Sequence, residues 1–144
     1  MDLKTLQQEW KTDSKIDPLI LGDQALGIPS LHSKYLALLS DEKVKFRKLT
    51  IEKKRLERKL SEYYHGKLDG KDIGREPYQC IVSTRSQLEK LLESDTDMIV
   101  IDDKVSESEE VILFIKEVIY SINGRSFVIK NYIDWNKWLN GGSL

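Results

Sequence analysis

The sequence predicts a mainly α-helical protein, built from one long, basic, coiled-coil-like helix and a C-terminal bundle of shorter helices. Apolar residues recur at intervals of three, four and seven along much of the chain, which is the spacing of a buried helix face. The composition agrees, because 33% charged and 40% hydrophobic residues with 8 glycines and 3 prolines suit helices better than strands joined by turns. A chain of 144 residues is long enough for one domain, or for two small lobes that share a long helix.

The first helical segment is predicted over residues 2–11. Leu3, Leu6 and Trp10 lie at helical spacing, and the polar run 12–14 breaks the pattern. Residues 16–19, which include a proline, are expected to form a loop that starts a second short helix.

The dominant feature is a helical pattern that follows Pro29 and runs to about Tyr64. Ser30 is its predicted N-cap, and a helix of this length extends for roughly 50 Å. Two heptad positions carry apolar residues, so the helix has a coiled-coil-like seam, which Glu42 and Lys53 interrupt. The seam consists of Tyr35, Leu39, Phe46, Leu49, Leu56, Leu60 and Tyr63.

Residues 65–74 are predicted to end this helix. Three glycines lie among charged residues there, which is typical of a surface loop, and Pro77 follows. This loop is the expected boundary between an N-terminal lobe of residues 1–74 and a C-terminal lobe of residues 75–144.

The second half of the chain is expected to fold into shorter helices. One covers residues 84–92, and the apolar run within 96–101 fits either a short strand or a helical turn. Ser106 and Glu109 form a capping box that predicts the start of the next helix, and Gly124 is placed to end it. A last helix carries the aromatic residues near the C-terminus.

The two final helices are more apolar than one buried face requires. We therefore expect part of their surface to be buried against another subunit of a homo-oligomer. The predicted oligomerisation residues are Phe114, Val118, Ile122, Tyr132, Trp135 and Trp138.

The long helix is strongly basic between residues 43 and 59, although the formal net charge of the chain is only −1. Arg47 and Lys54 lie seven residues apart, as do Lys48 and Arg55, so both pairs fall on one outward stripe opposite the seam. Such a stripe attracts a phosphate backbone, and neighbouring aromatic rings can stack on unpaired bases. The residues predicted to bind DNA are Arg47, Lys48, Lys53, Lys54, Arg55, Arg58, Lys59, Tyr64 and Lys67.

A nucleic acid is not the only partner that fits this stripe. Runs of lysine and arginine on long helices are often a solvated face, and an acidic protein would also be attracted to one. The alternative prediction is a structural or chaperone-like helical assembly protein whose basic stripe binds an acidic protein partner.

No catalytic, metal or cofactor site is predicted. Residues 66–71 resemble a phosphate-binding loop only faintly, because three residues separate the glycines where four are needed. The aspartates of 95–103 lack the pattern of a calcium loop and are expected to cap helices. His32 and His65 have no ligands at suitable spacing, and Cys80 is expected to be a small core residue. The chain is therefore predicted not to be an enzyme.

The location expected from the sequence is the cytosol. No segment approaches the ~20 apolar residues of a membrane span, and the first residues contain no apolar signal region. A single cysteine allows no intramolecular disulfide, which fits a reducing compartment.

An ordered series of residues runs along nearly the whole chain. It consists of Leu3, Leu6, Gln7, Glu9, Asp13, Ile16 and Asp17 at the start, of Lys53, Lys54, Tyr63, Tyr64, Gly66, Asp69 and Gly70 in the middle, and of Asp95, Asp97, Ile122, Arg125, Phe127, Ile129 and Lys130 before a terminal aromatic helix. Taken together and in register, these residues resemble the UvsY family, the recombination mediators of tailed phages. The resemblance depends on the ordered series rather than on one strong motif.

The resemblance implies a function and its partners. UvsY-type proteins bind single-stranded DNA as ring-like oligomers and carry no catalytic site. They contact the phage single-strand-binding protein and the strand-exchange recombinase, and they help the recombinase to replace the former on DNA. Such a protein works in the cytoplasm of the infected host cell. Strand binding is associated with basic residues just before the paired tyrosines, and oligomerisation with the C-terminal region.

The chain departs from the family pattern at one point. The pattern has two basic residues, separated by one position, shortly before the tyrosines. Arg58 matches the first, but the second is Leu60, so only Arg58 inherits the role. Lys59, between them, is expected to substitute only if the helix turns it toward the strand.

Overall fold

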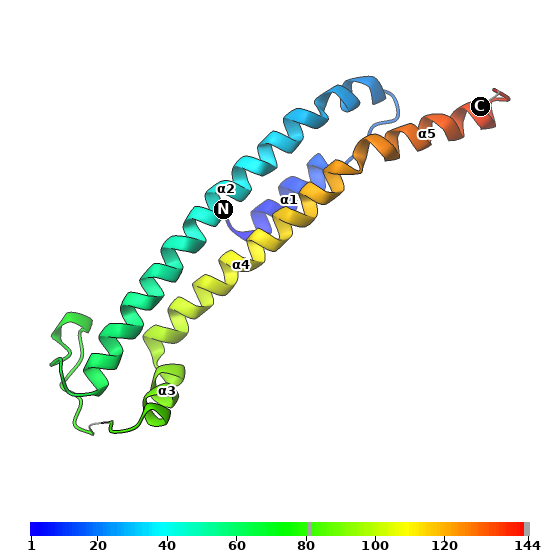
Figure 1. Cartoon of the computed structure of the whole chain (residues 1–144). Coiled ribbons are helices and arrows are strands. Elements are labelled where there is room, and N and C mark those ends of the chain that lie inside the picture. Colours follow the sequence, from blue (N-terminus) through cyan, green and yellow to red (C-terminus); the bar gives the residue numbers. More distant parts are fainter. Residues whose placement is uncertain (81, 143–144) are drawn as a thin grey trace. The chain divides into compact units, whose positions relative to one another are not determined.

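The computed structural model describes residues 1–80 and 82–142, and over this range it contains helices and no strand (Figure 1). The mainly α-helical fold class predicted from the sequence is confirmed. The elements in chain order are α1 (Leu3–Asp13), α2 (Leu21–Tyr64), the 3-10 helix η1 (Lys71–Ile73), α3 (Arg85–Ser94), α4 (Thr96–Asn123) and α5 (Arg125–Leu139).

The helices form two compact units. The first unit consists of Met1–Lys43 together with Glu110–Leu144, and the second unit consists of Val44–Glu109. Helices α2 and α4 each contribute residues to both units. The segments 1–74 and 75–144, which the sequence predicts as lobes, likewise each supply both units, so their separate roles stay a prediction.

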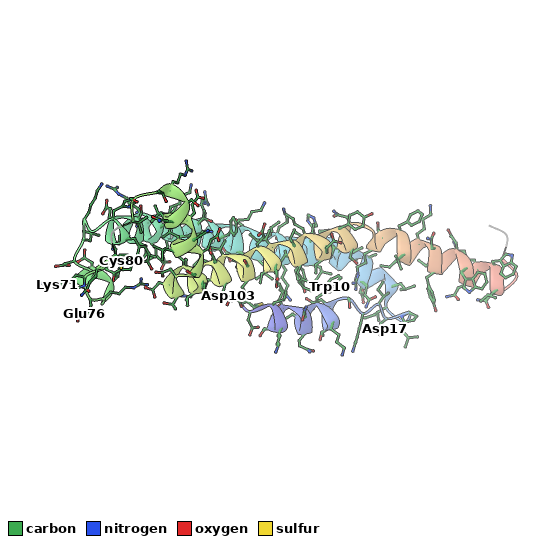
Figure 2. All side chains as sticks on the ribbon, turned by 90° about the horizontal axis from the view of Figure 1, so that it is seen from below. Trp10, Asp17, Lys71, Glu76, Cys80 and Asp103 are labelled. Carbon is green, nitrogen blue, oxygen red and sulfur yellow. The ribbon has the colours of Figure 1, made fainter. Side chains whose placement is uncertain are left out.

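Helix α1 packs against α2 and α4 in the first unit (Figure 1). Asp2 caps it by accepting a hydrogen bond of 2.7 Å from the backbone N–H of Thr5. Leu6 is buried in a core that α2 and α4 complete. Trp10, labelled in Figure 2, meets the ring of Tyr35 edge to face, with the centroids 5.6 Å apart. These contacts hold in place a helix that is too short to be stable alone.

A buried arginine links the start of α5 to the end of α1. The guanidinium of Arg125 donates hydrogen bonds of 2.9 Å to the backbone carbonyl of Asp13 and of 2.9 Å to that of Lys15. Because these carbonyls lie at and beyond the last turn of α1, the bonds satisfy acceptors that a helix end leaves open. A residue of the family-like series thus has a structural use here.

Helix α2 runs through Pro29, so its predicted start at Ser30 is wrong. The short helix expected before Ser30 is the first part of α2. A proline inside a helix removes one backbone N–H and usually marks a boundary. Ile28 and Leu31, on either side of it, pack against the core of the first unit. Packing before and after the proline therefore keeps this turn helical.

Residues 96–101 are helical, which settles the choice between strand and helix. Asp95 caps α4, because its Oδ1 accepts hydrogen bonds of 2.9 and 3.3 Å from N–H groups of the first turn. Met98 and Ile101, three residues apart, are buried together in the core of the second unit. The predicted helix start at Ser106 is wrong, since this burial starts the helix earlier.

Gly124 ends α4 as predicted, and α5 begins at the next residue. The N–H of Gly124 donates a hydrogen bond of 3.2 Å to the carbonyl of Ser121. Its φ of −86° is an ordinary right-handed value, so the junction does not use the left-handed turn that often ends a helix at glycine. The two helices therefore follow each other without a loop.

The second unit has its own core, which α2, α4 and the segment before α3 supply. Lys53, which interrupts the seam of α2, places its Nζ 2.6 Å from Oδ1 of Asp102 on α4. The interruption is therefore an ion pair between two helices. The buried core residues are Leu60, Tyr63, Tyr64, Val82, Met98 and Ile101.

Candidate nucleic-acid interface

Most of the predicted DNA-binding residues are exposed on the second-unit part of α2. The apolar seam faces the core, so the opposite side of the helix is left to solvent. Arg58 Nε lies 3.4 Å from Oε1 of Glu62 one turn later, and the Arg58 side chain is 83% exposed. Water screens such a pair, which leaves the cation available. The exposed cations are Arg47, Lys48, Lys54, Arg55, Arg58 and Lys59 on α2 and Lys67 in the following loop.

The departure from the family pattern has a structural explanation. Leu60 is 0% exposed, so it belongs to the core of the second unit and cannot contact a strand. Lys59 is exposed and lines a groove on the same helix. Lys59 is thus accessible, and its substitution for the second basic residue stays a prediction.

The structure gives the two remaining predicted residues a different environment. Lys53 is paired with Asp102, and Tyr64 is 8% exposed. The Tyr64 ring packs against the rings of Tyr63 and Tyr78, with centroids 5.2 and 4.9 Å away. Stacking of Tyr64 on a base would therefore require the ring to leave this cluster.

The buried Tyr64 and Asp95 and the half-buried Arg75 form a hydrogen-bonded group. The hydroxyl of Tyr64 donates to Oδ2 of Asp95 at 2.5 Å, and Arg75 donates to both oxygens of the same carboxylate. Burial opposes ionisation of Asp95, but the bonds from Arg75 and Tyr64 outweigh it and lower the pKa of this carboxyl to about 2. Burial and the bond to Asp95 raise the pKa of Tyr64 to about 12.

The loop after α2 is held to that helix by specific bonds. Gly70 has a φ of +87°, and its carbonyl accepts hydrogen bonds of 3.1 Å from Ile73 N–H and 2.8 Å from Arg75 N–H. The hydroxyl of Tyr63 donates to the carbonyl of Glu76 at 2.6 Å. Sequence reasoning missed Arg75, because a loop residue has no periodicity that could indicate burial.

Two shallow grooves run along α2 in the second unit. Each combines cations from α2 with one cation from a neighbouring helix, Lys104 of α4 or Arg85 of α3. The groove beside α4 has a volume of about 340 Å³ and is lined by Glu52, Arg55, Leu56, Lys59, Ile73, Asp97, Val100, Ile101 and Lys104. The groove beside α3 has a volume of about 370 Å³ and is lined by Lys54, Glu57, Arg58, Ser61, Arg85, Leu88, Glu89 and Leu92.

The residues predicted to form subunit contacts are divided between the core and the surface of the first unit. Val118 and Ile122 are buried in its core, and Phe114 packs against that core. Tyr132, Trp135 and Trp138 of α5 are exposed, and the last two rings are stacked with centroids 5.2 Å apart. Among the six predicted residues, those of α5 therefore offer the larger apolar surface to another molecule.

The residues considered for metal binding or catalysis do not come together as a metal site in the described structure. Among the described residues, no three His, Cys, Asp or Glu side chains are placed to hold a metal ion. Cys80 is exposed on the segment before α3 (Figure 2), so the prediction of a core cysteine is wrong. Val82, two residues later, occupies the buried position instead. No described helix is long and apolar enough to span a bilayer.

The all-helical fold of the described residues is shared with a class of DNA recombination proteins. The family model described as "Recombination, repair and ssDNA binding protein UvsY" matches residues 9–142. The chain therefore belongs to the UvsY family.

Two crystal structures of the bacteriophage T4 recombination mediator protein UvsY are similar to this chain. One is 26% identical with a TM-score of 0.84, and the match covers 97% of this chain and 98% of that chain. The other is 25% identical with a TM-score of 0.84, and the match covers 96% of this chain and 99% of that chain. No match occurs among curated proteins.

Proposed function

We propose that this protein is a recombination mediator, which binds single-stranded DNA without sequence preference and helps to load a strand-exchange recombinase in place of the single-strand-binding protein. The observation that carries the proposal is the set of exposed cations on α2: Arg47, Lys48, Lys54, Arg55, Arg58 and Lys59. Membership of the UvsY family supports the same reading.

The chemistry of this face suits a flexible strand. Lysine and arginine side chains neutralise phosphates and release bound counterions, so affinity falls steeply as salt rises. Phosphate contacts carry no sequence information, and the face has no arrangement of amide side chains that could read base edges. Strand binding is therefore tolerant of sequence.

Assembly multiplies the effect of each face. The exposed Tyr132, Trp135 and Trp138 give α5 an apolar surface that fits a contact between subunits. In a ring-like homo-oligomer each subunit adds its basic face, and a strand that reaches several faces binds far more tightly than one face allows.

The mediator acts through the DNA strand that it shares with the single-strand-binding protein and the recombinase. An oligomer that wraps the strand in the cytoplasm of the infected host cell weakens the hold of the single-strand-binding protein. The same oligomer presents the strand to the recombinase. This exchange needs binding surfaces and no bond-making chemistry by the mediator.

The experiment is a titration of a fluorescently labelled oligothymidine with the full-length protein across a salt series. Lys54→Ala, Arg55→Ala and Arg58→Ala combined should weaken binding about 10–100-fold, while the oligomer mass stays unchanged. Lys4→Ala, Lys11→Ala and Lys116→Ala combined remove the same charge from exposed first-unit positions and serve as the control.

The outcomes separate the mediator from an assembly protein with an acidic protein partner. Equal affinity of both triple variants, or an affinity that ignores salt, would contradict strand binding through α2. Recombinase loading onto DNA coated with single-strand-binding protein should then fail in the α2 variant and proceed in the control.

A further inference from the structure

We propose that the strand lies in the groove between α2 and α4 of the second unit, and that Lys104 of α4 is a phosphate contact beside Arg55 and Lys59. This inference rests on the proposed function and adds a helix to it. The sequence indicates cations of α2 and of the loop after it, whereas in the structure α4 brings Lys104 to the groove.

The cations of this groove are free to take a phosphate. Within the described part of the chain, Arg55, Lys59 and Lys104 form no salt bridge. In the groove beside α3, Arg58 pairs with Glu62 at 3.4 Å and Arg85 pairs with Glu89 at 3.0 Å. Of the three cations that line that second groove, only Lys54 has no carboxylate partner among the described residues, so the groove beside α4 offers more unpaired cations.

The floor of the groove suits unpaired bases. Leu56, Ile73, Val100 and Ile101 line it, and Val100 is 55% exposed. Base faces are apolar and are accessible only when they are not stacked inside a duplex. Because Tyr63 and Tyr64 are buried and Tyr78 packs against both of their rings, the aliphatic floor is the surface on which bases can rest. Cations above and an apolar floor below favour a single strand over a duplex.

Two acidic residues, Asp97 and Glu52, also line this groove. Asp97 accepts a hydrogen bond of 2.8 Å from Nη2 of Arg75, whose single positive charge it shares with Asp95. Glu52 has no such partner among the described residues. Glu52 is therefore the carboxylate of this groove that no cation offsets, and its removal should strengthen strand binding.

The test compares Lys104→Ala with Lys116→Ala, an exposed lysine of the same helix that lies in the first unit. With labelled oligothymidine, Lys104→Ala should weaken binding about 3–10-fold and reduce the salt slope by about 0.7, the value of one single-strand phosphate contact. Lys116→Ala should match the wild type. Glu52→Gln should bind about 2–5-fold more tightly than the wild type, by removal of one repelling charge.

Different outcomes would contradict the groove and the proposed strand-binding function. If Lys104→Ala binds like Lys116→Ala while the α2 triple variant is weakened, the groove is wrong and the proposed function stands. If the wild type itself does not bind the strand, both are wrong. Circular dichroism and light-scattering mass of each variant exclude loss of fold or assembly as the cause of weaker binding.

Discussion

Arg75 binds the carboxylate of Asp95 with both arms of its guanidinium, through hydrogen bonds of 2.6 and 2.8 Å. Arg75 lies in the loop after α2, and Asp95 caps the first turn of α4. The pair therefore joins a loop without regular structure to the start of a long helix. Bidentate charge-assisted bonds of this kind are among the strongest that side chains make.

Stability should fall in acid through Asp95. Its pKa lies at about 2, below the ordinary value of 3.8, so the carboxylate stabilises the fold above about pH 4 and that contribution is lost as pH falls toward 2. The contribution is about 2 kcal/mol. Urea unfolding should show a gap between the wild type and Asp95→Asn that narrows as pH falls from 5 to 2. A gap that is independent of pH would contradict the role of the charge.

Arg75→Lys should destabilise the protein by about 1–3 kcal/mol, although the charge is kept. Lysine cannot reach both oxygens of Asp95 and Asp97 at once, because it lacks the planar fork. Arg85→Lys is the matched control, since Arg85 is 91% exposed and pairs only with Glu89 on its own helix. Its effect should stay within about 0.5 kcal/mol. Equal losses of stability in thermal or urea unfolding would contradict the role of the forked Arg75 guanidinium.

Gly70→Ala should cost far more stability than Gly74→Ala. Both glycines have positive φ, so alanine is strained at either position. At Gly70 an added Cβ also meets the carbonyl oxygen of Arg75 at 2.6 Å, whereas nothing lies within 4 Å at Gly74. We expect losses of about 2–4 kcal/mol at Gly70 and about 1 kcal/mol at Gly74 in urea unfolding. Similar losses at both glycines would contradict the steric clash and would mean that the backbone at Arg75 moves to accommodate the Cβ.

Trp135→Ala combined with Trp138→Ala should yield smaller species with weaker strand binding, because avidity is lost with assembly. Both rings are exposed and stacked on α5, so their removal leaves the core of the first unit intact. Tyr120→Ala is the control, since Tyr120 of α4 is 78% exposed. Light-scattering mass measures the outcome, and a double variant with the mass of the wild type would exclude these rings from the subunit contact.

Periodicity predicted the helices because burial on one face governs them. The seam of α2 is real at Tyr35, Leu60 and Tyr63, all of which are buried. Local boundary signals were less reliable. Pro29 indicated a helix start, yet packing of Ile28 and Leu31 carries the helix through it. In general, tertiary burial decides where a helix ends when a cap or a proline suggests another position.

The candidate site could be predicted from the sequence only for residues that lie on a single helix. Spacing along α2 indicated Arg47, Lys48, Lys54, Arg55, Arg58 and Lys59, all of which are exposed. Lys104 was out of reach, because it joins the groove only if α4 begins before Ser106. Tyr64 and Arg75 depend on a loop that folds back, and no sequence period reports such a contact.

The two compact units also differ in their chromophores. Trp10, Trp135 and Trp138 all belong to the first unit, whereas the clustered Tyr63, Tyr64 and Tyr78 belong to the second. Light that excites only indole therefore reports on α1 and α5, where assembly is proposed. Phenol absorbance reports on both units, because Tyr35, Tyr120 and Tyr132 belong to the first. The protein thus carries an intrinsic optical probe of its first unit, with which assembly can be timed in an unlabelled sample.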